Sequence, residues 1–121
     1  MELERQQPKM MITRVIKLDS TVTTDVSEGD VPEEIMAFAD AVVGNGQARV
    51  SVSTPMDMKS FGNGSGASVS ITLSCNQDDD TIATVVRQLG AWTRFFAKEQ
   101  CSIADDEFRQ LHAQRYPGKA L

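Results

Sequence analysis

Apolar and polar residues largely alternate near the start of the chain. From Met10 to Thr23, most even-numbered positions are apolar and most odd-numbered positions are polar. A period of two with many β-branched residues is typical of a strand with one buried face. The run is longer than most strands, so we expect it to break or bend near Asp19-Ser20. Val22 is assigned to the same apolar face as Met10.

The segment SEGDVPEE, residues 27–34, predicts the start of a helix. Asp30 is expected to cap it, with Glu33 completing a capping box, and Pro32 suits a first turn. Gly44 is expected to end the helix in the left-handed conformation. The apolar residues between these limits share one helical face: Ile35, Phe38, Ala39 and Val42.

Two further alternating segments, 48–58 and 67–75, predict a long antiparallel hairpin. Each has one apolar face and one face rich in Ser and Thr, which suits a sheet with one side in water. Asp78, Asp79 and Asp80 then favour the start of a helix that reaches about Gln100. Ser102 with Asp105 is interpreted as a second cap, opening a last helix over 103–115.

These elements predict an α+β fold in the order β-α-β-β-α-α, with the helices packed on one face of an antiparallel sheet. We expect an N-terminal arm over 1–9, a single domain over 10–116 and a tail over 117–121.

Charge and composition narrow the classes of function. The chain has 121 residues, a formal charge of −5 and 40% hydrophobic residues. A globular chain is expected, and a globally basic nucleic-acid-binding protein is disfavoured. The sequence shows neither an apolar run that could span a bilayer nor a signal-peptide pattern. We therefore expect a cytoplasmic location and no membrane partner. Two cysteines, Cys75 and Cys101, permit one disulfide, but reduced thiols are favoured.

The glycine-rich stretch FGNGSG, residues 61–66, lies between two strands and carries no Walker lysine. Both nucleotide-binding fingerprints are therefore rejected, since they need a strand followed by a helix. The stretch is either the tip of a hairpin or a lid in which Phe61 and Asn63 close over a ligand.

Three basic residues of the long helix, Arg87, Arg94 and Lys98, fall on one stripe beside its buried face. They are either a solvated surface or a site for an anion or an acidic partner. Phe95 and Trp92 widen the apolar face, which predicts a second contact with either the last helix or another protomer. Gly90 would allow another backbone to approach closely, as in a symmetric helix-to-helix dimer.

Other titratable residues give no catalytic pattern. Arg14 sits on the apolar parity of its strand, which indicates either a sheet edge or a buried charge at a site. The acidic triplets at 78–80 and 105–107 lack the spacing of a calcium loop, and His112, the lone histidine, has no partner for nucleophilic chemistry. We expect no catalytic site, no metal and no cofactor.

The stretch FGNGSGASVSITLSCNQDDDTI, followed by a long amphipathic helix, resembles small uncharacterised accessory proteins encoded by bacteriophages. The resemblance covers about residues 47–100. It implies an anti-defence type of protein that binds host or phage molecules, including nucleotide signals.

The leading hypothesis is a non-enzymatic phage accessory or inhibitor protein, expected to be a homo-oligomer. It would sequester an anionic nucleotide signal or block a host defence protein, using Arg87, Arg94, Lys98, Phe61 and Asn63 for a ligand and Trp92 with Phe95 as an interface. The alternatives are a single-stranded nucleic-acid-binding protein, which the acidic chain disfavours, and a small enzyme of unknown reaction.

Overall fold

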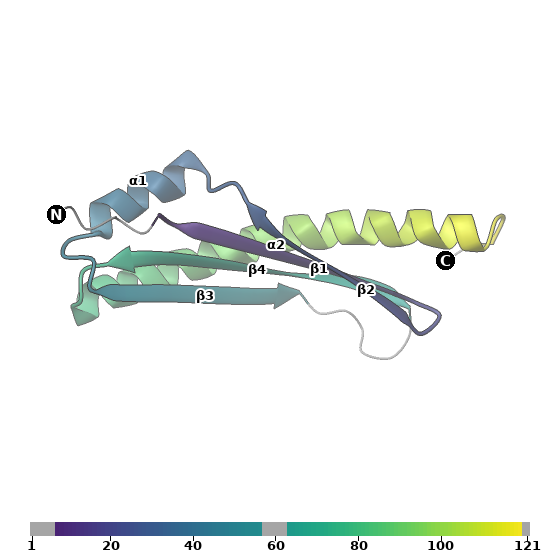
Figure 1. Ribbon diagram of the computed structural model, residues 1–121, viewed down its shortest axis with the longest axis horizontal. Coiled ribbons are helices and arrows are strands. Elements are labelled where there is room, and N and C mark those ends of the chain that lie inside the picture. Colours follow the sequence, from purple (N-terminus) through teal and green to yellow (C-terminus); the bar gives the residue numbers. More distant parts are fainter. Residues whose placement is uncertain (1–6, 57–62, 120–121) are drawn as a thin grey trace.

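The computed structural model describes residues 7–56 and 63–119 and has an α+β fold (Figure 1). A four-stranded antiparallel sheet has the spatial order β2-β1-β4-β3. Two helices complete the fold of the described residues. The elements are, in chain order, β1 (Lys9–Leu18), β2 (Thr21–Gly29), α1 (Glu33–Val42), β3 (Ala48–Met56), β4 (Gly64–Cys75) and α2 (Asp79–Arg115). The α+β class is confirmed, but the order is β-β-α-β-β-α, so the predicted order is wrong at both ends.

The predicted order is wrong at its start because the early alternating run forms two strands, which pair as a hairpin. Leu18 pairs with Thr21 across a two-residue turn, and both turn residues have positive φ, 51° at Asp19 and 70° at Ser20. These values are those of a type I′ turn, which matches the twist of the flanking strands. Because such turns usually contain glycine, Asp19-Ser20 gave only a weak signal. The turn moves Val22 to the face of the sheet opposite Leu18, which corrects its predicted place.

The second strand also changes how α1 begins. β2 continues to Gly29, and α1 begins at Glu33 after Pro32, with no capping hydrogen bond from a side chain. The predicted cap at Asp30 is therefore wrong. The predicted stop is confirmed, because Gly44 follows the helix with φ of 45°. A Cβ at Gly44 would lie 2.6 Å from the Cβ of Asn76, so glycine is also required for space.

The predicted hairpin of β3 and β4 is confirmed. Val50 pairs with Leu73 on the buried face, and on the wet face Ser53 and Ser68 lie within hydrogen-bond distance at 3.3 Å. Gly64 and Gly66, from the glycine-rich stretch, belong to β4 and pair with β1. Residues 57–62, including Phe61, lie outside the described residues.

The second error in the element order concerns the end of the chain. α2 is one helix of 37 residues, about 55 Å long. Its start is as predicted, since the Asp78 carboxylate accepts a hydrogen bond from the Thr81 N–H at 2.8 Å. The predicted second cap at Ser102 is wrong, because Ala104 and Phe108 continue the buried stripe of the same helix.

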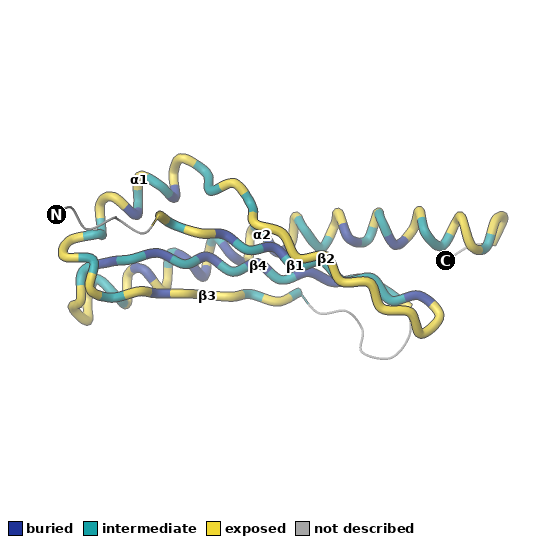
Figure 2. The backbone as a smooth tube through the Cα atoms, viewed as in Figure 1, coloured by how far each residue is buried: buried dark blue, intermediate teal, exposed yellow. Residues whose placement is uncertain are grey.

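One face of the sheet packs against both helices, and the other face is left to solvent (Figure 2). The strands supply alternate residues to a single cluster, which α1 enters through Ile35 and Ala39. The buried members from the sheet and α2 are Met10, Ile12, Val50, Val69, Ile71, Leu73, Cys75, Val85, Leu89 and Ala97. Leu18, Ala67, Ala104 and Phe108 are buried outside this cluster, so α2 is covered well beyond the main core.

We expect Ser20→Gly to stabilise the protein. At φ of 70° a non-glycine side chain is strained, and removing that strain should outweigh the added flexibility of the unfolded chain by about 0.5–1 kcal/mol. Thermal unfolding should then occur about 2–5 °C higher. Ser20→Ala, the matched control, should give no increase. An unchanged or lower melting temperature for Ser20→Gly would contradict the type I′ turn.

Candidate functional site

The three predicted basic residues lie together on the solvent side of α2. Arg87, Arg94 and Lys98 are all exposed, and within 7–56 and 63–119 none of them forms an ion pair. Their spacing places them about 100–140° around the helix from its buried stripe. They therefore point further into solvent than the sequence suggested, and their charge is available to a partner.

Phe95 lies on the same solvent side of α2. Its side chain is 63% exposed, and its ring makes an edge-to-face contact with Phe96, with ring centroids 5.3 Å apart. Helical spacing makes it a neighbour of both Ala91 and Lys98. We define the outer face of α2 as Arg87, Ala91, Arg94, Phe95 and Lys98. This face combines three cations with one exposed aromatic ring.

Trp92 packs against the core and does not belong to this outer face. It is half-buried and makes an edge-to-face contact with Phe38 of α1, with ring centroids 5.3 Å apart. α1 thus covers Trp92, and residues 103–115 continue α2 instead of forming the predicted last helix. Of the two predicted interface residues, only Phe95 remains available at the surface.

Gly90 has a role different from the predicted one. A Cβ at this position would meet a single described atom within 4 Å, the guanidinium Nη1 of Arg94 at 3.4 Å. No other backbone among the described residues approaches it. The absence of a side chain therefore leaves room for Arg94 to fold back over the preceding turn of its own helix.

Asn63 lies far from the basic residues. Its side-chain oxygen accepts a hydrogen bond from the Asp19 N–H at 2.9 Å, and Tyr116 also contacts Asp19 by donating its hydroxyl to that carboxylate. Tyr116 follows Lys98 by 18 positions, which puts these two residues about 27 Å apart along the helix axis. The structure therefore does not bring Asn63 to the predicted anion site.

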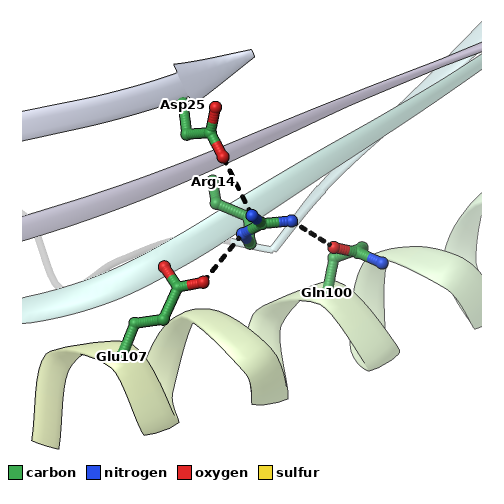
Figure 3. Close-up of polar contacts among 4 residues, drawn as sticks. All are labelled: Arg14, Asp25, Gln100 and Glu107. Carbon is green, nitrogen blue, oxygen red and sulfur yellow. Dashed lines mark hydrogen bonds and ion pairs between the residues drawn. The ribbon is translucent and has the colours of Figure 1, made fainter. Parts of the chain in front are cut away.

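A polar cluster around Arg14 joins the hairpin to α2 (Figure 3). Arg14 donates to the Asp25 carboxylate at 2.8 Å and to the Gln100 side-chain oxygen at 2.9 Å. Its Nε makes no hydrogen bond and lies 3.4 Å from a carboxylate oxygen of Glu107. β1 is an inner strand, so the sheet-edge interpretation is wrong and Arg14 is a charge held between layers.

A second polar contact fixes the C-terminal end of α2. Arg115 lies 3.5 Å from the Asp19 carboxylate, which also accepts from Tyr116. The hydrogen bond from Tyr116 lowers the pKa of Asp19, and the same bond raises the pKa of Tyr116. These contacts hold the turn between β1 and β2 against the end of the helix.

The two cysteines and the histidine lie in different surroundings among the described residues. Cys75 and Cys101 are free thiols, and burial raises the pKa of Cys75. His112 lies between the rings of Phe108 and Tyr116. The described part of the chain holds no cluster of three potential metal ligands.

Comparison with protein-family models, curated proteins and solved structures found no match. Across residues 7–56 and 63–119, neither helix combines the length and the apolar character needed to cross a bilayer.

We expect Arg14→Ala to lower the free energy of unfolding by about 1–2 kcal/mol, because two carboxylates lose their shared cation. The loss of unfolding free energy should be smaller in a Glu107→Gln background, because one of the two carboxylates is already absent there. Arg109→Ala, which removes an exposed pair with Asp105, should cost less than about 0.5 kcal/mol. Equal costs for Arg14 and Arg109 in chemical denaturation would show that the cluster adds nothing beyond a surface pair.

Proposed function

We propose that this is a non-enzymatic binding protein whose outer face of α2 docks onto an acidic surface of another protein. The observation that carries the proposal is the exposed ring of Phe95 beside three cations that have no ion-pair partner among the described residues. The role is that of a small accessory or inhibitor protein that occupies its target.

The composition of this face is typical of an interface centre. Aromatic residues and arginine are enriched among the residues that contribute most to binding, and an arginine can engage a carboxylate with two parallel hydrogen bonds. The chain as a whole carries a charge of −5. A local group of cations on such a protein favours an acidic partner through steering and selectivity.

The geometry favours a protein partner over a small anion. Small-molecule sites are usually concave and enclose most of the ligand, whereas these residues project from the solvent side of one helix. A helix face that carries an exposed ring suits insertion into a groove of a partner. The nucleotide-sequestering hypothesis relied on Phe61 and Asn63 closing over the cations. Phe61 lies outside the described residues, and Asn63 is bonded to Asp19, which contacts Tyr116 just beyond the C-terminal end of α2. The likeness to phage accessory proteins makes a bacterial host protein the partner we propose.

The test compares the protein with its Arg87→Ala/Arg94→Ala variant and with Phe95→Ala. Proteins captured from a bacterial lysate would be identified by mass spectrometry, and each would then be purified for titration calorimetry. We expect both variants to weaken the dissociation constant of the partner at least about tenfold, since each removes a central contact. Thermal stability should stay near that of the original protein.

The matched control is Arg109→Ala/Lys119→Ala, which removes the same charge outside the outer face of α2. It should bind as the original protein does. If the control and test variants lost affinity equally, the effect would come from net charge alone, and the proposed site would be wrong. Native mass spectrometry tests the alternative of a small ligand. An anionic small molecule that is bound to the original protein and absent from the Arg87→Ala/Arg94→Ala variant would favour ligand sequestration over a protein partner.

A further inference from the structure

The β2 strand is an exposed edge of the sheet. All residues from Thr21 to Glu28 are exposed, and the tube in Figure 2 shows this as one continuous stretch. β2 pairs with β1 on one side, and nothing among the described residues pairs with its other side. A free edge of nine residues offers a row of backbone donors and acceptors for another strand.

The turn geometry identifies which residues present that row. In a hairpin closed by a two-residue turn, the closing pair exchanges both backbone hydrogen bonds, and such pairs recur at every second position. Leu18 and Thr21 are the closing pair here. The odd-numbered residues of β2 therefore bond to β1. The even-numbered residues direct their N–H and C=O groups outward: Val22, Thr24, Val26 and Glu28.

The two edges of the sheet differ in their protection. β3, at the opposite edge, contains Pro55 and Arg49, and both proline and charge discourage pairing with another chain. β2 has no proline and is rich in Val and Thr, and its charged residues are two acids, Asp25 and Glu28. Its central acid, Asp25, is held by Arg14 at 2.8 Å. β2 is therefore the edge suited to pairing.

We propose that a second copy of this chain pairs antiparallel with β2 about a two-fold axis at Thr24. Two sheets of four strands would then form one continuous sheet. In this register Thr24 faces its own copy, and Val22 of each chain faces Val26 of the partner subunit. These valines are 56% and 59% exposed in the single chain, and cross-strand pairing would cover both.

Charge and the pairing of the valines together separate this register from its neighbours. With the axis at Thr24, Asp25 faces Thr23 and Glu28 faces Ser20, so no like charges stand opposite each other. An axis at Asp25 would place two aspartates opposite each other, which is destabilising, and would pair Val22 with Glu28. An axis at Thr23 would leave Val26 opposite the turn residue Ser20. The register at Thr24 thus matches the valines and separates the acids.

The pairing also has a consequence for binding, which rests on the function proposed for the outer face of α2. A two-fold axis perpendicular to the sheet keeps both α2 helices on the same side of the joined sheet. Two equivalent helix faces would then be presented together, so a partner with repeated sites could be held at both.

Analytical ultracentrifugation of the full chain tests the dimer. We expect a concentration-dependent species of twice the mass of one chain. Thr24→Pro removes an outward donor and blocks the edge, so it should give a monomer with an unchanged circular-dichroism spectrum. Thr24→Ala should still form the dimer. A monomer at all concentrations, or a dimer that persists in folded Thr24→Pro, would overturn the proposal.

A cross-linking experiment decides the register even if the proline variant fails to fold. A hydrogen-bonded pair of opposing residues has Cα atoms about 5.5 Å apart, which lies within the range of a disulfide. In a Cys101→Ser background, Thr24→Cys should form a covalent dimer under mild oxidation. Thr23→Cys should not, because it faces Asp25 of the partner subunit. Equal cross-linking of the two variants, or none from Thr24→Cys, would contradict the register.

Discussion

The buried stripe of α2 must stay covered over almost the whole length of the helix, and much of the fold follows from this requirement. The main cluster covers the first part through Val85, Leu89 and Ala97. The second part carries Ala104 and Phe108, which are buried outside that cluster. The hairpin of β1 and β2 extends the sheet far enough to serve this part (Figure 1). A shorter sheet would leave those side chains in water.

Polar contacts fix the hairpin to the helix where the main core ends. Arg14 links the hairpin to Gln100 and Glu107 of α2, and Asp19 holds Tyr116 just beyond the helix. Charged contacts near a surface add little free energy one by one, but they select one position of the helix along the sheet. The outer face of α2 is then presented on a fixed element, which lowers the entropic cost of binding.

The sequence predicted local structure well and long-range structure poorly. The β3–β4 hairpin, the start of α2 after the acidic triplet 78–80 and the end of α1 at Gly44 are confirmed. Each of these predictions depends only on residues that are adjacent in the sequence. The turn at Asp19-Ser20 was only suspected, since neither residue is the glycine that such turns favour. Ser102 has the character of a cap, but burial of Ala104 and Phe108 outweighs it and the helix continues.

The candidate site shows the same division. Periodicity placed Arg87, Arg94 and Lys98 together on α2, and the structure keeps them together. No spacing rule relates Arg14 to Gln100, 86 positions away, and no local signal placed Asn63 at the end of the sheet distant from the cations. Trp92 and Phe95 are close in sequence, yet α1 covers one and leaves the other exposed. Such separations depend on packing between elements and not on the sequence around each residue.

Amide hydrogen exchange across residues 98–105 tests the central claim most directly, because a rigid outer face requires α2 to continue through Ser102. If the helix is unbroken, these amides should exchange as slowly as those of residues 88–97, since local opening would break the same hydrogen-bonded helix. Fast exchange confined to residues 101–105 would reveal two helices joined by a loop. That result would contradict both the single α2 and the fixed surface on which the proposed function depends.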